Sequence, residues 1–387
     1  MTPLPHTNTL DELMELLAEH GFDGLAEAIT ILWNEVMKLE RAEVLGAEPY
    51  QRTESRRGYA NGFKPKTVRT RVGAITVDVP QTRGVEFYPS SLERGERSER
   101  ALKLAVAEMY VQGVSTRKVA AITKELCGLD ISSSQVSRAA RLLDEELQQW
   151  RNRPLGEIPY LILDARYEKI RHGGCVIDCA VLVAIGITSD GKRSILGVSV
   201  SLSEAEVHWR EFLARLIERG MHSTRLVTSD DHAGLKAARK AVLPGVPWQR
   251  CQFHLQQNAM HYVPQVALRK QVATDIRNVF DAPDRAAAER LLEQAVAKYD
   301  KSAPKLAAWM EENIPDGLTV TTLPPAHRRR LRTTNMLERV NKEIKRRTRV
   351  ATLFPNDDSL LRLVSAVLIE LSEDWETGKV YLNIETE

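Results

Sequence analysis

Cysteine and long apolar runs are scarce in this sequence. Four cysteines in 387 residues are too few for a disulfide framework, and free thiols suit a reducing compartment. The N-terminus lacks the basic-then-apolar pattern of a secretion signal. No apolar run approaches the roughly 20 residues that a membrane-spanning helix needs. We therefore expect a cytoplasmic protein with no membrane partner.

An excess of charge of one sign is also missing. The chain carries 54 Lys and Arg against 52 Asp and Glu, and 43% of its residues are hydrophobic. This composition excludes a disordered tail and allows two or three domains. No Gly-rich phosphate loop supports nucleotide-triphosphate chemistry. The charge is segregated instead, because residues 1–45 hold nine acids and two bases, whereas residues 327–349 hold ten bases and two acids.

The first 152 residues form three regions by pattern. Residues 51–98 contain a β-hairpin signature with a basic face, which alternates over residues 68–79 and ends at Pro80. Residues 99–152 contain helices joined by short turns, which suits a helix-turn-helix with Ser115 and one of Ser132, Ser133 and Ser134 as caps. Residues 1–50 are predicted to be helical, with an apolar stripe that either packs on its own domain or forms a dimer seam: Phe22, Leu25, Ile29, Leu32, Val36 and Leu39.

The rest of the chain has an α/β pattern. The runs 160–165 and 179–188 are almost wholly apolar, as expected for strands of a sheet covered on both faces. Further strands are predicted at 193–200 and 225–229, and helices at 204–219, 233–242, over most of 255–312, around residue 338 and at 359–375. The sequence therefore predicts a sheet flanked by helices, followed by a long helical stretch.

Three acids stand at positions where they can converge. Asp164 and Asp230 each follow an apolar strand, and carboxylates at the ends of neighbouring strands can meet at one sheet edge. Glu338 lies on a predicted helix, beside the apolar face that packs on the sheet and on the same flank as several cations. Asp231 is a rival to Asp230 and an alternative cap for the next helix. Such carboxylates are the oxygen ligands that hard divalent cations need.

Two divalent cations held by three carboxylates can cut and join phosphodiesters. One cation activates the attacking water or 3′-hydroxyl, and the other stabilises the leaving oxygen. Any one of these acids alone is more often a helix cap or loop residue. The order strand-Asp, strand-Asp, helix-Glu is more specific than its members.

At these residues the sequence resembles the Mutator-type family of bacterial insertion-sequence transposases, over nearly the whole chain. The most specific motif is TTNMLERVNKEIKRRT at residues 333–348. The other matching segments are residues 57–59, 71–73, 163–165, 229–235, 251–254 and 354–356.

The resemblance implies a ribonuclease H-like catalytic core of residues 155–250 and 326–387, interrupted by a helical insertion at 251–325. It implies that Asp164, Asp230 and Glu338 are the catalytic, metal-binding triad, with Mg²⁺ as cofactor and Mn²⁺ as its substitute. The partners would be double-stranded DNA, as terminal inverted repeats and target, and further copies of the chain in a homodimer or higher oligomer. The candidate DNA contacts are Arg57, Lys64, Arg69, Arg71, Gln135, Arg138, Arg141, Lys342, Lys345, Arg346 and Arg349.

Three further residues have a structural and a functional interpretation. Cys251 and His254 match the family's Cys-x-x-His signature. A zinc site would need two more ligands, with His232 and His261 as candidates, so we expect a packing role and no zinc. Trp309 either packs in a core or stacks on an unpaired base near the cut end, as an aromatic residue does in related transposases.

Two other functions remain open from the sequence. A ribonuclease H-like nuclease or resolvase would cut branched DNA without joining a 3′-hydroxyl to a target. A DNA-binding repressor with an inactive core would bind element ends without metal-dependent cleavage.

Overall fold

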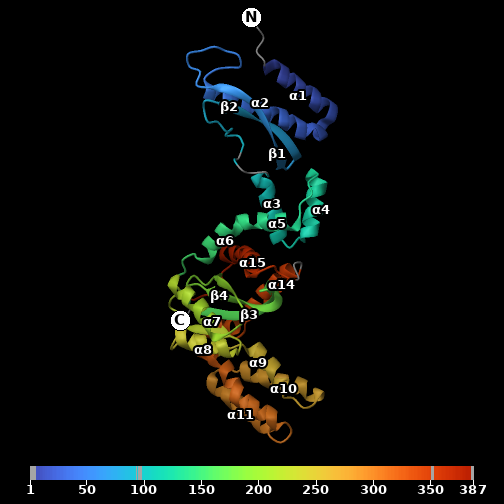
Figure 1. Ribbon diagram of the computed structural model, residues 1–387. Coiled ribbons are helices and arrows are strands. Elements are labelled where there is room, and N and C mark those ends of the chain that lie inside the picture. The colour runs from blue at the N-terminus through green and yellow to red at the C-terminus, as the bar shows by residue number, and fades with distance from the viewer. Residues whose placement is uncertain (1–5, 93, 95–97, 350–352, 385–387) are drawn as a thin grey trace. The chain divides into compact units, whose positions relative to one another are not determined.

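The computed structural model describes residues 6–92, 94, 98–349 and 353–384. The chain divides into two compact units, Met1–Leu142 and Leu143–Glu387 (Figure 1). The first five residues of the predicted N-terminal region, and residues 93 and 95–97 of the hairpin region, lie outside the described residues. No helix of the described residues is long and apolar enough to cross a membrane.

Unit 1 begins with two helices and a hairpin: α1 (His6–His20), α2 (Leu25–Leu45), β1 (Tyr59–Thr70) and β2 (Gly73–Arg83). The fully buried Met37 of α2 packs on the apolar face of the hairpin, with Val68 and Val77. Most of the apolar stripe expected from the sequence lies on a face of α2 that does not pack on the hairpin. Its members Phe22, Leu32, Val36 and Leu39 are exposed, so they do not contribute to the core of unit 1.

The hairpin is longer than predicted, and Pro80 does not end it. Strand β2 continues to Arg83, and Pro80 pairs with Phe63 beside a bulge between Ala60 and Phe63. Proline is tolerated in edge strands and at bulges because it lacks only the N–H that would extend the ladder. Both conditions hold in this two-stranded sheet.

Three helices complete unit 1: α3 (Arg100–Val111), α4 (Thr116–Cys127) and α5 (Ser133–Ala140). The predicted caps are confirmed. Ser115 accepts a hydrogen bond from the Lys118 amide, and Ser132 forms a capping box with Gln135. Gly128 ends α4 in the left-handed conformation, with a φ of 65°, which glycine adopts without strain.

Unit 2 contains a mixed sheet of five strands in the order β5-β4-β3-β6-β7. Strand β4 pairs antiparallel with β3 on one side and with β5 on the other, whereas β6 pairs parallel to β3 and β7 pairs parallel to β6. The three residues of β7 were not predicted, because so short a run carries no periodic signal. The strands are β3 (Tyr160–His172), β4 (Cys175–Ile187), β5 (Arg193–Ser201), β6 (Leu226–Ser229) and β7 (Trp248–Arg250).

Helices cover both faces of this sheet, as the apolar strands predicted. On one face α7 (Glu206–Glu218) and α8 (Ala233–Val242) join Leu161, Leu163 and Leu182 in a common core. The helices α14 (Asn335–Thr348) and α15 (Asp357–Thr377) contact β3, and α15 also contacts β5. The first helix of the unit, α6 (Asp144–Arg151), is tied to α15 by an ion pair between Asp144 and Arg362.

A helical segment with its own core separates β7 from α14. Its residues Leu255, Ile276, Leu292 and Met310 belong to one buried cluster, and these helices lie together at one end of unit 2 in Figure 1. The segment comprises α9 (Gln252–Ala259), α10 (Val266–Phe280), α11 (Arg285–Tyr299), α12 (Pro304–Asn313) and α13 (Pro325–Leu331).

We expect Gly234→Ala to destabilise unit 2. A Cβ at Gly234, in the first turn of α8, would lie 2.2 Å from the Glu204 carbonyl oxygen and 2.9 Å from the Glu206 amide nitrogen. These are backbone atoms, so α8 and the start of α7 would have to separate, at a cost of roughly 1–3 kcal/mol. Thermal unfolding measures the effect. In the control Gly156→Ala the new Cβ meets no atom within 4 Å, and an equal midpoint for the two variants would contradict the close approach.

Candidate active site

Parallel pairing of β3 with β6 brings Asp164 level with Asp230. In the observed register Leu161 pairs with Val227 and Ile162 pairs with Thr228. The same register, extended by two residues past this pairing, brings Asp164 level with Asp230, which follows the end of β6, and the two charges interact. Residues in register on parallel strands point to the same face of a sheet. The Asp164 carboxylate accepts a hydrogen bond from the Ala165 amide, and that of Asp230 accepts one from the Asp231 amide.

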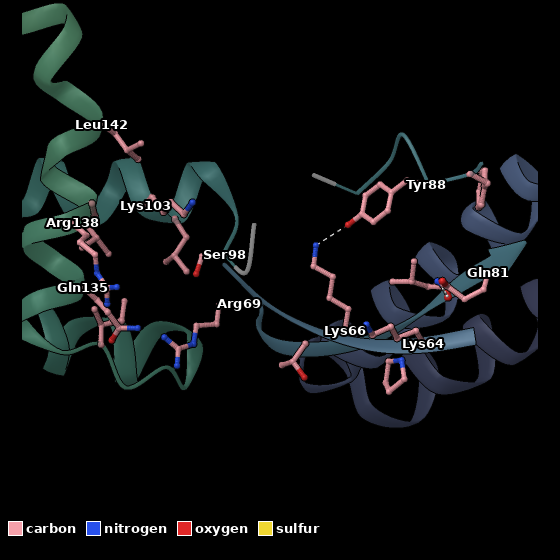
Figure 2. Close-up of a pocket in the computed structure, with 18 residues that line it drawn as sticks. Lys64, Lys66, Arg69, Gln81, Tyr88, Ser98, Lys103, Gln135, Arg138 and Leu142 are labelled. Carbon is pink, nitrogen blue, oxygen red and sulfur yellow. Dashed lines mark hydrogen bonds between the residues drawn. The ribbon is translucent and has the colours of Figure 1, made fainter. Parts of the chain in front are cut away.

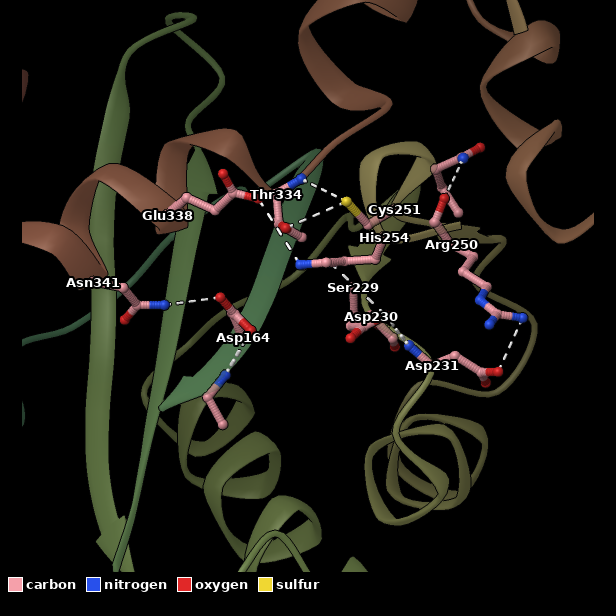
Figure 3. Close-up of polar contacts among 12 residues, drawn as sticks. Asp164, Ser229, Asp230, Asp231, Arg250, Cys251, His254, Thr334, Glu338 and Asn341 are labelled. Carbon is pink, nitrogen blue, oxygen red and sulfur yellow. Dashed lines mark hydrogen bonds and ion pairs between the residues drawn. The ribbon is translucent and has the colours of Figure 1, made fainter. Parts of the chain in front are cut away.

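Helix α14, which packs on β3, carries the third acid. Its residues Leu337, Val340 and Ile344 are fully buried or nearly so, as predicted, which leaves Glu338 at the edge of the packed face. One turn further on, the Asn341 side chain donates a 2.8 Å hydrogen bond to Asp164 Oδ2. The helix that carries Glu338 is therefore joined directly to the first aspartate (Figure 3).

Alternate residues of β3 continue this contact along α14. Arg166 donates a hydrogen bond to the Asn341 carbonyl oxygen and forms an ion pair with Glu168. Glu168 in turn accepts a hydrogen bond from the Thr348 hydroxyl, at 3.0 Å. Because side chains alternate along a strand, Asp164, Arg166 and Glu168 share one face, and that face meets α14.

Cys251 connects the second aspartate to the start of α14. Its amide donates a hydrogen bond to the Ser229 carbonyl oxygen, next to Asp230. Its buried sulfur accepts hydrogen bonds from the amide and the hydroxyl of Thr334, both at 3.4 Å. Thr334 is the N-cap residue of α14, but its hydroxyl is used by Cys251 instead of capping the helix.

His254 lies between two of the three acids. Its Nδ1 is 3.8 Å from Asp230 Oδ1, and its Nε2 is 3.9 Å from Glu338 Oε1 (Figure 3). Interaction with the Cys251 sulfur, together with the charges of Asp230 and Asp164, raises the pKa of His254 to about 9. An imidazolium at this position offsets part of the repulsion between the carboxylates.

Burial sets the ionisation of the other groups. It raises the pKa of Asp164 to about 6, with further contributions from the charges of Asp230 and Glu204. Burial also opposes ionisation of the Cys251 thiol, but hydrogen bonds from His254 and Thr334 outweigh it and lower the pKa of that group. Neighbouring groups therefore have opposite shifts, which is common at functional sites.

The carboxylate set suits a hard divalent cation in its chemistry. Glu338 Oε1 is buried and accepts no hydrogen bond, so one acceptor oxygen remains to be satisfied by a cation. Among the described residues, no group of three or more His, Cys, Asp or Glu side chains is already arranged to hold a metal ion. A cavity of about 140 Å³ beside the aspartates is also lined by Glu204 and His232.

Asp231 forms ion pairs with other residues, so its role differs from that of the neighbouring Asp230. It forms ion pairs with Arg250, at 2.9 Å, and with Lys236, at 2.8 Å. The N-cap residue of α8 is His232, so Asp231 does not cap that helix. This pairing leaves Asp230 as the acid of the Asp-Asp pair that faces His254.

The side chains of the candidate DNA contacts differ in their exposure and in their contacts within the protein. Arg71 is bound by Glu99, Arg346 pairs with Glu343, and the Gln135 side chain belongs to the capping box of α5. Arg69 is half-buried. The remaining candidates are exposed: Arg57, Lys64, Arg138, Arg141, Lys342, Lys345 and Arg349.

Trp309 lies in the core of the helical segment. The residue is 9% exposed, and its ring stacks on that of Tyr262, with centroids 5.5 Å apart. This position favours the packing interpretation over base stacking. The exposed member of the pair is Tyr262.

Sequence reasoning missed Asn341 and Glu204, and it missed the contact of Thr334 with Cys251. Asn341 follows Glu338 by three residues, a helical spacing that places both on one side of α14, so a signal was present. The contact of Thr334 with Cys251 joins residues 83 apart in the chain, and no local pattern predicts it.

Comparison with known proteins identifies the class. Residues 5–378 match the family model described as Transposase, Mutator family. The chain is therefore a transposase, an enzyme that acts on DNA, and it belongs to the Mutator family. This confirms the resemblance seen in the sequence.

Several relatives are similar over almost their whole length. The chain is 60% identical to the transposase for insertion sequence element IS406 of Burkholderia multivorans, with 97% of this chain and 98% of the relative covered. It is 46% identical to the transposase for ISRM5 of Rhizobium meliloti, with coverages of 94% and 91%. It is 36% identical to the transposase for IS256 in transposon Tn4001 of Staphylococcus aureus, with both chains fully covered.

We expect Asp164→Asn to raise the stability of the metal-free protein at alkaline pH. The pKa of Asp164 in the folded state, about 6, exceeds its ordinary value of 3.8. Its contribution to stability is therefore present below pH 3.8 and is lost as the pH rises through 6. Since a pKa difference of one corresponds to about 1.4 kcal/mol, the gain is a few kcal/mol at most.

Thermal unfolding in EDTA between pH 4 and pH 8 tests this expectation. The midpoint of Asp164→Asn should exceed that of the wild type at pH 8, and the difference should shrink toward pH 4. Asp178→Asn is the control, because Asp178 is exposed and pairs with Lys169 at the surface. Identical pH profiles for wild type and Asp164→Asn would show that burial does not raise the pKa of Asp164 in the folded state.

Proposed function

We propose that this transposase binds the terminal inverted repeats of an insertion sequence and performs metal-dependent strand cleavage and strand transfer. Asp164, Asp230 and Glu338 would be its catalytic and metal-binding residues. The main support is that Asp230 and Glu338 lie on either side of His254, and that Asp164 is joined to the helix of Glu338 through Asn341. These acids come from β3, from the end of β6 and from α14, and 174 residues separate the first from the last.

The cofactor that fits this site is Mg²⁺, with Mn²⁺ as a substitute, because all three acids offer oxygen ligands. When bound, the cations would activate the attacking hydroxyl and stabilise the leaving oxygen. Asn341 holds Asp164 in place through its hydrogen bond, and Cys251 fixes the start of α14 relative to Ser229. The contacts of Cys251 with Ser229 and Thr334 support a packing role for this residue rather than zinc ligation.

The finer architecture is part of the proposal. A mixed sheet with acids on β3 and at the end of β6, and with a long helical segment before α14, is compatible with a ribonuclease H-like core of residues 155–250 and 326–387. The separate apolar core of α9 to α12 supports an insertion domain at 251–325. The capped pair α4 and α5 supports a helix-turn-helix within residues 99–152.

Assembly follows from the reaction, because two element ends must be joined in one event. A homodimer or higher oligomer would bring two active sites to the paired ends. The exposed Leu32, Val36 and Leu39 of α2 support helix pairing between copies. The acidic composition of residues 1–45 makes DNA a poor alternative occupant of this face.

We expect Asp164→Asn, Asp230→Asn and Glu338→Gln each to abolish cleavage of element ends while binding persists. Each change keeps the shape of the side chain and removes the charge that a cation needs. The assay incubates purified protein with its flanking element ends in Mg²⁺ or Mn²⁺ and maps the product strands. Asp178→Asn, at the far end of the β3–β4 pair, should retain activity.

The products also separate the alternatives. Cleavage without joining to a target would favour a nuclease or resolvase, and end binding without any cleavage by the wild type would favour a repressor. Undiminished cutting by any of the three variants would remove that residue from the site.

Single substitutions Lys342→Ala and Lys345→Ala should weaken DNA binding in a salt-sensitive way. Both side chains are exposed on α14, on the flank that carries Glu338. The slope of log K against log salt concentration is negative, and loss of one phosphate contact makes it less steep by about 0.9. Lys240→Ala, an exposed cation on α8, is the control. Slopes equal to that of the wild type would argue against phosphate contact at α14.

A further inference from the structure

The small cavity beside Asp164 and Asp230 contains an acid that the proposed triad does not use. The cavity has a volume of about 140 Å³, and its polar lining residues are Asp164, Glu204, Trp209, Asp230, Asp231 and His232. We call it the acidic cavity. A larger cavity in unit 1 is lined instead by candidate DNA contacts such as Lys64 and Arg138 (Figure 2). Glu204 is the acid that the proposed function leaves without a role.

A close approach of two backbone segments places Glu204 at the acidic cavity. Glu204 lies between β5 and α7, next to Ala205, the N-cap residue of α7. The first turn of α8 packs so tightly on this segment that a Cβ at Gly234 would lie 2.2 Å from the Glu204 carbonyl oxygen. Because glycine has no Cβ, position 234 allows the segment that carries Glu204 to meet the loop that follows Asp230.

The Glu204 carboxylate lies at the cavity without a Lys or Arg partner. Its side chain is 14% exposed, and its Oε2 is 3.8 Å from His232 Nδ1. It also lies near Tyr167, whose pKa is raised by burial and by the charge of Glu204. Within the part of the chain that the structure describes, no Lys or Arg forms an ion pair with Glu204, Asp164 or Asp230.

The charges of these three acids affect one another. Burial raises the pKa of Asp164 to about 6, and the charges of Asp230 and Glu204 raise it further. The three carboxylates are therefore close enough to repel. A cation bound among them would remove this repulsion, because a nearby opposite charge favours the ionised form of a carboxyl group.

Trp209 gives an independent indication of a ligand. It is fully buried and lines the acidic cavity, and its Nε1 has no hydrogen-bond partner among the described residues. An indole N–H can only donate, so it needs an oxygen acceptor, and a buried donor without one is unfavourable. A bare cation does not satisfy a donor, whereas the oxygen of a water bound to a cation does.

The size of the acidic cavity suits a hydrated cation. A single water needs on the order of 10–15 Å³ of such volume, and the cavity has about 140 Å³. Among divalent cations, Mg²⁺ usually keeps several waters and binds only one or two carboxylates directly. A site for hydrated Mg²⁺ therefore needs groups that bind its waters as well as direct ligands.

We propose that Glu204 is a fourth acid of the metal site and holds a divalent cation through the water ligands of that cation. Asp164 and Asp230 would bind the cation directly. Glu204 would accept hydrogen bonds from its waters, and the indole of Trp209 would donate one to a water oxygen. Glu204 is then a positioning residue. This inference rests on the proposed function and deepens it, because it assigns to the cation a residue outside the triad.

Mn²⁺ binding by the full-length protein without DNA tests this role. Glu204→Gln keeps the shape of the side chain and removes its charge, so it should weaken Mn²⁺ binding by about 10- to 100-fold, the loss typical of an outer-shell partner. Electron paramagnetic resonance of free Mn²⁺ measures the affinity. Glu206→Gln is the matched control, because Glu206 pairs with Arg210 and does not line the cavity. Equal affinities for wild type and Glu204→Gln would overturn the proposal.

Thermal unfolding in EDTA separates cation binding from folding. Without metal, removal of one of three mutually repelling charges should leave Glu204→Gln at least as stable as the wild type. Glu204→Asp keeps the charge on a shorter side chain and should recover part of the Mn²⁺ affinity. A lower unfolding midpoint for Glu204→Gln, with no recovery of affinity by Glu204→Asp, would make Glu204 a purely structural residue.

The Mn²⁺ dependence of cleavage gives a further readout on flanking element ends. Glu204→Gln should raise the Mn²⁺ concentration for half-maximal cleavage more than it lowers the rate at saturating Mn²⁺. A lower saturating rate with an unchanged Mn²⁺ requirement would contradict the cation-holding role.

The outcomes distinguish the role of Glu204 from the proposed function. Failure of the wild type to bind Mn²⁺ would overturn the proposed metal-dependent chemistry itself. Binding that Asp164→Asn weakens and Glu204→Gln leaves unchanged would overturn only the role of Glu204.

Discussion

Parallel pairing of β3 with β6 is the constraint on which the proposed active site depends. The register places Asp164 and Asp230 at the same level, where two like charges meet at a partly buried sheet edge. Burial of Asp164, with a smaller contribution from the charge of Asp230, costs stability, as the raised pKa of Asp164 indicates. The buried strand residues before each aspartate offset this cost, because their packing maintains the register of β3 and β6 whatever the charges at the strand ends.

Glu338 reaches the same edge by a different route. The chain leaves the sheet after β7 and forms a helical segment with its own apolar core before it returns as α14. Folding that segment separately shortens the effective loop between the second aspartate and the glutamate, which reduces the entropy lost on closure. Cys251 then joins the two ends of the excursion, since it contacts Ser229 through its amide and Thr334 through its sulfur.

Charge is distributed to suit two different tasks. Around Asp164, Asp230 and Glu338 the acids are concentrated, and His254 lies between Asp230 and Glu338. The exposed lysines of α14 lie along the flank. In unit 1, Glu99 forms an ion pair with Arg71. A net charge near zero therefore conceals local surfaces of strong sign, which is what DNA binding requires.

Local sequence pattern determined most of the secondary structure and pointed to the three acids that we propose as catalytic. The apolar runs before Asp164 and Asp230, the helical spacing around Glu338, and the serine caps of α4 and α5 act over a few residues, so they can be read without the fold. Tertiary structure decided the rest. The continuation of β2 past Pro80 depends on pairing with β1, and the burial of Trp309 depends on the core of the helical segment between β7 and α14. The contacts of Asn341, Cys251 and Glu99 join distant residues. Such contacts exist only once the chain has folded, because they depend on which elements pack together rather than on any local periodicity.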